Sequence, residues 1–396
     1  MHIPFCVKKC AYCDFLSGPA DDQTKRVYVD ALVREMESMK EKYSNYRVDT
    51  VFLGGGTPSI LEGSGTARIF HALFDNFDIS PDAEITMEVN PGTVSEEKAE
   101  AWKACGINRL SIGLQSADDM ELRMLGRIHT FEAFFDTWGM VRRAGFDNVN
   151  IDLISALPGQ TPEGWEKTLR AVAELDPEHI SAYSLIVEEG TPFYEIYGEP
   201  GQEVQARRAD GQNRLLPPLP DEDAEREIYQ ATERILAAYG YHRYEISNYA
   251  KKGYECRHNL GYWDRKEYLG LGLGAASLIR ECRFHNTTDM GKYLNIFREA
   301  KEKMSDPAAG EGAAEDYEEL TLNDRMEEFM FLGLRKTKGI READFRNLFG
   351  KEIRQVYGDQ IAGLTEQGLL AGAEGRIFLT ERGTDISNYV FSEFLF

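Results

Sequence analysis

The stretch HIPFCVKKCAYCDF (residues 2–15) places three cysteines within eight positions, directly after a short apolar run. Cys6, Cys10 and Cys13 have the spacing C-x3-C-x2-C. Thiolates are soft metal ligands, and three of them on one loop can bind three corners of a [4Fe-4S] cluster. One iron then stays open for a small molecule with an amine and a carboxylate. Zinc is the alternative, but its structural sites need four ligands, and only His2 lies nearby as a fourth candidate.

The composition is that of a soluble globular protein. Of the 396 residues, 42% are hydrophobic and 28% are charged. The sequence shows neither an apolar run of bilayer length nor a signal peptide, so we expect a cytosolic location. Six unevenly spaced cysteines then indicate metal or redox chemistry rather than a disulfide framework. The formal net charge of −22 repels polyanions, which argues against nucleic acid as a partner.

Short apolar runs alternate with amphipathic stretches over the first 190 residues. Helical periodicity is clear in residues 28–43 and 130–145. The apolar runs, which predict strands, are MHIPF (1–5), TVFLG (50–54), ITMEV (85–89), RLSIGL (109–114), VNIDLI (149–154) and ISAYSLI (180–186). Strand and helix in alternation predict parallel βαβ units, which close into a full or partial barrel or spread as an open sheet.

The chain beyond residue 190 is less regular. A loop rich in proline and glycine (199–220) precedes a predicted helix near 221–239 and a strand-like run at 242–250. Helical patterns and a hairpin near the C-terminus predict a winged-helix-like unit, from residues 321–336, 341–347, 351–367 and 368–383. Acidic residues outnumber basic ones in this unit, which argues against DNA reading.

These patterns divide the chain into four segments. We predict the parallel βαβ units, closed into a full or partial barrel or spread as an open sheet, over residues 1–220 and an extension of them over residues 221–303. The small, acidic stretch 304–319 is the predicted linker. The α-rich C-terminal domain takes up residues 320–396.

Polar side chains and a glycine-rich turn follow successive predicted strands. GGGTPS (54–59) follows the second strand, Glu88 closes the third, Gln115 closes the fourth with Arg127 just beyond, and Asp152 lies in the fifth. Functional side chains of parallel barrels collect at the carboxyl ends of the strands. Glycines let a backbone approach a ligand closely, and its N–H and C=O groups suit a carboxylate and an ammonium. Each feature alone has a plain structural interpretation, but together they predict a cofactor site.

The cysteine spacing, with aromatic Tyr12 before the last cysteine, resembles the radical S-adenosylmethionine (SAM) family. In that family the methionine end of SAM chelates the open iron, and an electron from the cluster cleaves the sulfonium to give methionine and a 5′-deoxyadenosyl radical. The segments HIPFC, GGGTPS, EVNPG, RLSIGLQS, GRIHT and DLISALPGQT narrow the resemblance. They are similar to the branch that contains oxygen-independent coproporphyrinogen III oxidase and its haem-chaperone relatives.

This resemblance implies an α/β fold, a partial (β/α)6 radical-SAM barrel followed by a small α-rich, winged-helix-like C-terminal domain. It implies a [4Fe-4S] cluster on Cys6, Cys10 and Cys13. It also implies SAM contacts from Gly55, Gly56, Thr57, Glu88, Gln115, Arg127 and Asp152, with Arg127 pairing with the methionine carboxylate.

Three features favour a haem chaperone over the oxidase within that branch. The oxidase has a further cysteine two residues after the third, where this chain has Phe15. The oxidase also has an N-terminal extension, whereas the cysteines here begin at residue 6. CRHNLGYW (256–263) contains H-N-x-x-Y-W, which in the chaperones is associated with haem binding. The resemblance thus implies haem as ligand and a recipient haem protein at the inner face of the membrane. It leaves open a homodimer, the oxidase activity and whether SAM is cleaved.

His258 is the predicted haem ligand, because a neutral imidazole is a standard axial ligand of haem iron. Tyr262 and Trp263 can pack against a porphyrin face. Cys256 is a competing ligand, since a strand in this region would place it on the same face as His258.

Overall fold

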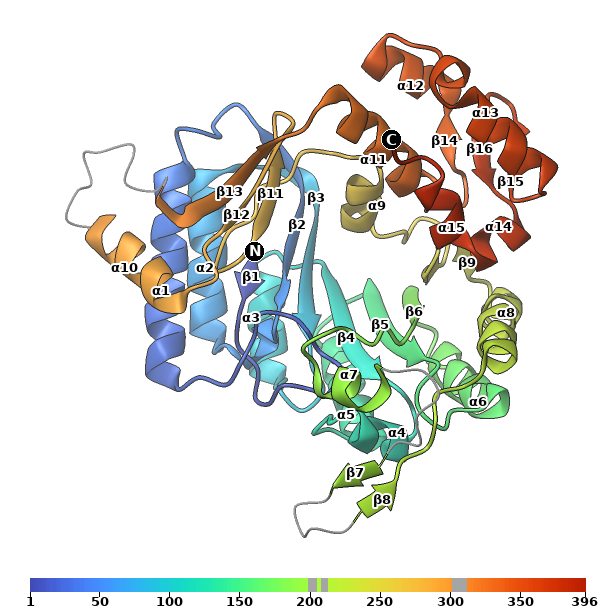
Figure 1. Ribbon diagram of the computed structural model, residues 1–396. Coiled ribbons are helices and arrows are strands. Elements are labelled where there is room, and N and C mark those ends of the chain that lie inside the picture. The colour runs from blue at the N-terminus through green and yellow to red at the C-terminus, as the bar shows by residue number, and fades with distance from the viewer. Residues whose placement is uncertain (199–204, 208–212, 301–311) are drawn as a thin grey trace.

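A sheet of eight strands forms the body of the protein, which is seen here in a computed structural model (Figure 1). The structure describes residues 1–198, 205–207, 213–300 and 312–396. Six strands are parallel and follow one another in chain order: β1 (His2–Ile3), β2 (Arg47–Gly55), β3 (Asp78–Val89), β4 (Arg109–Gln115), β5 (Val149–Ser155) and β6 (His179–Ser184). The antiparallel strands β10 (Asn248–Ala250) and β9 (His242–Arg243) extend the sheet beyond β6. The predicted parallel units are therefore confirmed.

The first predicted strand is shorter than its apolar run, because Pro4 has no N–H for a ladder hydrogen bond. The chain leaves the sheet at this point as the cysteine loop. Cys6 N–H donates to the Gly18 carbonyl over 3.0 Å, which closes the loop before the first helix begins.

Helices cover the outer face of the sheet. They are α1 (Asp22–Met39), α2 (Gly63–Asn76), α3 (Glu96–Ala104), α5 (Phe131–Arg143), α6 (Pro162–Ala173) and α8 (Glu222–Ala238). The short helices α4 (Asp119–Met124) and α7 (Pro192–Tyr197) belong instead to a small apolar cluster beside the cysteine loop. Side chains of each strand alternate between the helix layer and the barrel interior. In β4, Leu110, Ile112 and Leu114 belong to the apolar core, so Arg109 and Ser111 face the interior. Polar residues on the interior face are thus a direct result of the strand period.

A second sheet lies beside β1 and β2. It consists of β11 (Ala276–Ile279), β12 (Cys282–Asn286) and β13 (Ala314–Glu319), and α10 (Met290–Ala300) packs against α1 (Figure 1). The linker predicted over 304–319 is wrong for its last six residues, because they form β13 and pair with β12. Their acidic side chains lie mostly on the exposed surface of an edge strand. An exposed edge strand can have the same acidic composition as a linker, and for this reason the prediction from composition failed. Residues 304–311 lie outside the described residues.

The predicted loop 199–220 is described only in part. Two short strands, β7 (Gln205–Arg207) and β8 (Asn213–Leu215), pair with each other in antiparallel register.

The C-terminal domain has its own apolar core and stands against α9 (Arg257–Trp263) and β9 (Figure 1, red). Its elements are α11 (Leu322–Gly333), β14 (Ile340–Arg341), α12 (Glu342–Phe349), α13 (Ile353–Glu366), β15 (Leu370–Ala373), β16 (Arg376–Leu379), α14 (Glu381–Asp385) and α15 (Ser387–Ser392). β15 and β16 form the predicted hairpin, and β14 completes the sheet in the order β14-β16-β15. The helices α11, α12 and α13, together with this small sheet, agree with the predicted winged-helix-like arrangement. Among the described helices, none combines the length and apolarity of a membrane span.

The buried carboxylate of Glu35 joins the second sheet to the barrel. It accepts hydrogen bonds from Gly272 N–H (2.7 Å), Asn286 Nδ2 (2.5 Å) and Tyr293 Oη (2.6 Å). These donors belong to the loop before β11, to β12 and to α10, whereas Glu35 belongs to α1. One fully buried side chain thus holds four segments together.

The stability of the protein should reflect the titration of Glu35. Burial raises the pKa of Glu35 to about 6, so the folded chain holds this proton more tightly than the unfolded chain does. The favourable contribution is therefore present at low pH and is lost as the pH rises through 6. Relative to Glu35→Gln, the wild type should lose about 1 kcal/mol in free energy of unfolding between about pH 5 and about pH 7.5. Urea unfolding at several pH values measures this difference, and Glu37→Gln on the exposed face of α1 is the control. Parallel pH profiles for wild type and Glu35→Gln would contradict it.

Candidate functional site

The three cysteines lie on the irregular loop between β1 and α1, at the carboxyl ends of the parallel strands (Figure 1). All three are free thiols of intermediate exposure. Two side chains from other loops approach their sulfurs: Thr57 Oγ1 lies 3.6 Å from Cys6 Sγ, and Arg127 Nη1 lies 3.8 Å from Cys10 Sγ. Hydrogen bonds to sulfur of this kind tune the reduction potential of an iron-sulfur cluster. The thiols and their donors therefore fit a cluster.

The alternative of a zinc site finds no support in the loop. His2, the fourth zinc ligand considered, directs its Nδ1 to the Leu273 carbonyl. Among the described residues, no three side chains of His, Cys, Asp or Glu lie so that they could hold a single metal ion. A [4Fe-4S] cluster does not need its three thiolates to meet at one point, because each thiolate binds a different iron. The donor set therefore suits a cluster better than one ion.

The glycine-rich turn after β2 uses its own N–H groups within the chain. The N–H groups of Gly54, Gly55, Gly56 and Thr57 donate, in this order, to Met1 O (3.0 Å), Glu88 Oε2 (3.0 Å), Ile3 O (2.8 Å) and Phe5 O (2.7 Å). The expectation that these N–H groups would serve a ligand is therefore wrong. The carbonyl oxygens of a turn, unlike these N–H groups, suit an ammonium group.

Packing explains why this turn needs glycine. Gly55 has a φ of +112°, and a Cβ there would lie 1.7 Å from the His2 ring. A Cβ on Gly56 would lie 2.6 Å from the Phe5 carbonyl oxygen. Both glycines let the turn press against β1, so they fix the position of the cysteine loop relative to β2.

Two interior carboxylates lie on β3 and β5, with β4 between them. Glu88 at the end of β3 accepts from Gly55 N–H, and Asp152 on β5 accepts from Ser111 Oγ (2.9 Å) and Asn150 Nδ2 (2.7 Å). Burial, followed by the charge of Asp152, raises the pKa of Glu88 to about 7. Near neutral pH, Glu88 can therefore either donate a hydrogen bond or accept one.

Gln115 and Arg127 occupy constrained positions at the same edge. Gln115 has a φ of +75°, next to a register shift between β4 and β5. A positive φ is costly for a non-glycine residue and is often found at functional sites. Arg127 Nη2 donates to Asn90 Oδ1 (2.8 Å) and to the Gly113 carbonyl. Its guanidinium is thus held in place beside Cys10.

The structure therefore brings the three cysteines and the seven predicted SAM residues to one edge of the sheet. It also adds residues that sequence reasoning missed. Asn90 orients Arg127 and donates to Thr57 Oγ1 (2.7 Å), and Tyr183 Oη lies 3.4 Å from Gln115 Oε1. Asn90 stands within the EVNPG segment, so its position two residues after Glu88 was an available signal. Tyr183 on β6 had no such signal, because its strand read only as apolar.

His258 lies away from this edge, on α9. Its Nδ1 is 2.9 Å from Thr50 Oγ1, and its ring stacks on Phe52 with centroids 5.0 Å apart. Tyr262 contacts the same ring edge-on at 4.9 Å. Thr50 precedes Gly54 by four residues on β2, which corresponds to roughly 13 Å along the strand. Burial lowers the pKa of His258 to about 3, so its imidazole is neutral near pH 7. Its Nε2 has no partner among the described residues.

The segment around His258 is a helix and not the strand that the alternative ligand required. Cys256 is the N-cap of α9 and is fully buried, and its Sγ lies 3.5 Å from Glu84 Oε1. Burial raises the pKa of Cys256 to about 11. A buried, protonated thiol is a poor metal ligand. The prediction that Cys256 shares a face with His258 is therefore wrong.

Glu84 holds the start of α9. Its carboxylate accepts from the N–H groups of Arg257 and His258, each over 3.0 Å, in addition to the Cys256 thiol. Glu84 lies on β3 and is only 7% exposed. This side chain replaces the N-cap hydrogen bond that Cys256 does not supply.

A cavity of about 640 Å³ runs along β2 beside His258. It follows the edge of β2 that β1 leaves unpaired, since β1 pairs only with Gly54 and Gly55. Its largely apolar lining includes His2, Phe15, Thr50, Phe52, His258 and Tyr262. The volume lies within the roughly 300–1,000 Å³ of typical ligand pockets. Trp263 does not line it: its ring lies under the Arg335 guanidinium at 4.4 Å, so the predicted porphyrin contact of Trp263 is not supported.

Comparison with known proteins identifies the family. Residues 1–172 match the radical SAM superfamily, and residues 320–386 match the HemN C-terminal domain. The chain is 35% identical over 394 residues to the heme chaperone HemW of Lactococcus lactis, covering 100% of this chain and 96% of that protein. It is also 35% identical over 396 residues to the heme chaperone HemW of Bacillus subtilis, covering 100% and 98%.

The chain belongs to the HemW family of the radical SAM superfamily. A solved structure supports the fold of this family member over nearly its whole length. Coproporphyrinogen III oxidase (HemN) from Escherichia coli, described as a radical SAM enzyme, superposes with a TM-score of 0.81 at 25% identity, covering 99% of this chain and 88% of that one. The predicted family and the predicted barrel with its C-terminal domain are both confirmed.

Replacing Glu84 should destabilise the protein. Glu84→Ala leaves two helix N–H groups without an acceptor and removes a charge that offsets the buried Arg109. We expect a loss of roughly 2–4 kcal/mol in free energy of unfolding, measured by urea unfolding followed by circular dichroism. Asp78→Ala, at an exposed position on the same strand, should change the stability by less than about 0.5 kcal/mol. Equal losses in both variants would contradict the capping role of Glu84.

Proposed function

We propose that the protein is a haem chaperone that binds haem through His258 and transfers it to a recipient haem protein. One observation supports this proposal above the others. The neutral imidazole of His258 packs against the rings of Phe52 and Tyr262 and lines the 640 Å³ cavity. The names of the relatives from Lactococcus lactis and Bacillus subtilis agree with it.

The surroundings of His258 favour ligation through Nε2. Thr50 Oγ1 can accept a hydrogen bond from Nδ1–H, and in that tautomer Nε2 keeps its lone pair for the iron. Phe52 and Tyr262 restrict rotation of the ring. Haem iron bound here would receive an axial nitrogen ligand, and the apolar lining of the cavity would shield the porphyrin from water.

We also propose that Cys6, Cys10 and Cys13 hold a [4Fe-4S] cluster with SAM beside it. Thr57 and Arg127 would donate to the cluster's thiolates, as they do to the free thiols. The carbonyl oxygens of the Gly54–Thr57 turn suit the ammonium of SAM. Glu88, Gln115 and Asp152 complete the proposed SAM contacts, with Asp152 fixed by Ser111 and Asn150.

The proposed partners follow from chemistry and resemblance. The recipient is a haem protein, which we place at the inner face of the membrane, and the chaperone itself in the cytosol. A formal net charge of −22 disfavours nucleic acid as a further partner.

Oxygen-independent coproporphyrinogen III oxidation is the second candidate function, because the HemN structure is similar over nearly the whole chain. Phe15, which stands where the oxidase has a further cysteine, is 63% exposed and lines the cavity, so this sulfur is replaced by an apolar group at the cavity wall. Anaerobic incubation with SAM, a reductant and coproporphyrinogen III separates the two functions. Formation of protoporphyrinogen IX would establish the oxidase and overturn the chaperone.

Replacement of His258 should abolish specific haem binding. We expect His258→Ala to lower haem affinity by about tenfold or more and to shift the Soret band, because the axial nitrogen is lost. Cys256→Ala should keep the wild-type spectrum, since its thiol is buried against Glu84. His71→Ala is the control for adventitious surface ligation, because His71 is exposed on α2. A His258→Ala variant with wild-type affinity and spectrum would remove His258 as the ligand.

Each of the three loop cysteines should be required for the cluster. After anaerobic reconstitution, Cys6→Ala, Cys10→Ala and Cys13→Ala should each lose most of the iron-sulfur absorption and bound iron, because each removes one corner of the cluster. Cys105→Ala, at a half-buried thiol that caps the end of α3, should keep both. Iron retention in all three loop variants would contradict the assignment.

A further inference from the structure

The helix α9 is anchored at its two ends by different domains. Its first residues are capped by Glu84 of the barrel. At its other end, the C-terminal domain supplies three contacts: Arg335 over the Trp263 ring, Lys336 paired with Asp264, and Glu328 paired with Arg265. The helix that carries His258 is only seven residues long. A displacement of either end of α9 would therefore also displace His258.

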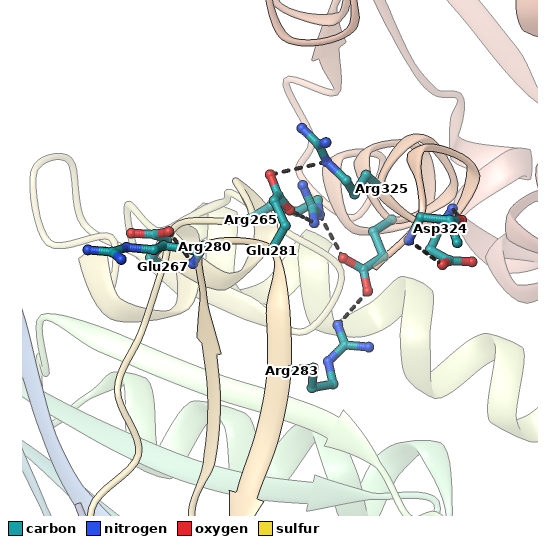
Figure 2. A network of polar contacts seen from close by, with 9 residues as sticks. Arg265, Glu267, Arg280, Glu281, Arg283, Asp324 and Arg325 are labelled. Atoms are coloured by element: carbon teal, nitrogen blue, oxygen red, sulfur yellow. Dashed lines mark hydrogen bonds and ion pairs between the residues drawn. The ribbon is translucent and has the colours of Figure 1, made fainter. Parts of the chain in front are cut away.

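Glu328 is the most buried of these contacts. Its carboxylate pairs with Arg265 Nε at 2.7 Å and with Arg283 Nη2. The side chains of Glu328 and Arg265 are 7% and 8% exposed. Glu281 completes the network, accepting from Arg265 Nη2 (2.8 Å) and pairing with Arg325 Nε (3.2 Å). Figure 2 shows Arg265, Arg283 and Arg325 converging from three segments, which are the turn after α9, β12 and α11.

The same network holds two walls of the cavity. Arg265 follows α9, whose His258 and Tyr262 line the cavity, and Arg283 lies on β12, which pairs with β11. Residues of β11 and its approach also line the cavity, among them Tyr268 and Ala276. Tyr268 is itself bound to Leu278 of β11 by two backbone hydrogen bonds of 3.0 and 2.9 Å.

Local backbone conformation makes these walls dependent on the ion pairs. Arg265 has a φ of +51°, and Arg280 and Glu281, in the turn between β11 and β12, have φ values of +50° and +59°. The left-handed region is unfavourable for residues with a Cβ and persists where surrounding contacts hold it. Without Glu328, the guanidinium groups of Arg265 and Arg283 would lose their shared counter-charge.

We propose that Glu328 is a positioning residue through which the C-terminal domain controls how firmly the cavity holds haem. This inference rests on the proposed function. Glu328 ties α9 and the β11–β12 hairpin to α11, so His258 and the facing wall keep their separation only while α11 is docked. A recipient protein that draws α11 away would loosen both walls together and release the haem.

The test compares Glu328→Gln and the milder Arg283→Gln with a matched control, Glu342→Gln. Arg283 is 40% exposed, so its loss is less threatening to folding. Glu342 pairs with Arg354 inside the C-terminal domain at 3.0 Å and touches neither cavity wall. Two measurements are made on each full-length protein: hydrogen exchange of backbone amides in residues 257–265 without haem, and the rate of haem transfer to apomyoglobin.

Glu328→Gln should exchange faster in residues 257–265 and should release haem roughly 2- to 30-fold faster than wild type. Arg283→Gln should show smaller changes of the same sign, and Glu342→Gln should match wild type. Unchanged exchange in both test variants would overturn the positioning role. Faster exchange with an unchanged transfer rate would overturn the control of haem. If the wild type binds no haem, the proposed function fails, while faster exchange would still support Glu328 as the residue that holds α9.

Discussion

Parallel pairing of β1 to β6 places the carboxyl ends of six strands at one edge of the sheet, and the candidate cofactor site depends on that edge. The register of these strands brings together residues from separate βα units: the cysteine loop, the glycine turn, Glu88, Gln115 and Asp152. The strand period then sorts the side chains: apolar residues enter the helix-covered core, and polar ones face the interior. A polar interior is stable only because its members hydrogen-bond one another, as Asp152 does with Ser111 and Asn150.

The two candidate sites lie at different heights of the same barrel. The cysteines and Glu88 occupy the carboxyl edge, whereas His258 lies beside Thr50, roughly four residues further back on β2. The cavity along β2 connects the two levels, since its lining includes both His258 and the Gly54–Gly55 turn. Ligands at both sites would therefore lie close enough along one strand to influence each other.

Burial sets the chemistry of the individual groups. The low pKa of His258 keeps its imidazole neutral, and the high pKa of Cys256 keeps its thiol protonated. These two residues are separated by one position in sequence, yet the helix start places one thiol against Glu84 and leaves the imidazole beside the cavity. The start of α9 therefore decides which of the two side chains can bind haem iron. The buried ion pair of Glu328 and Arg265 lies at the other end of this helix.

The sequence by itself determined the parallel strands, the winged C-terminal domain, the cysteine set and the residues at strand ends, because strand and helix periods and ligand spacing are local properties. Only the tertiary structure decided the rest. In the folded chain, the N–H groups of the glycine turn donate to other backbone and side-chain oxygens of the protein. The acidic segment 314–319 pairs as a strand, and Cys256 is buried against Glu84. The tertiary structure also placed Trp263 under Arg335 and joined α9 to α11 through Glu328. Each of these outcomes is a contact between residues far apart in the chain, and such contacts leave no periodic trace in the sequence around either partner.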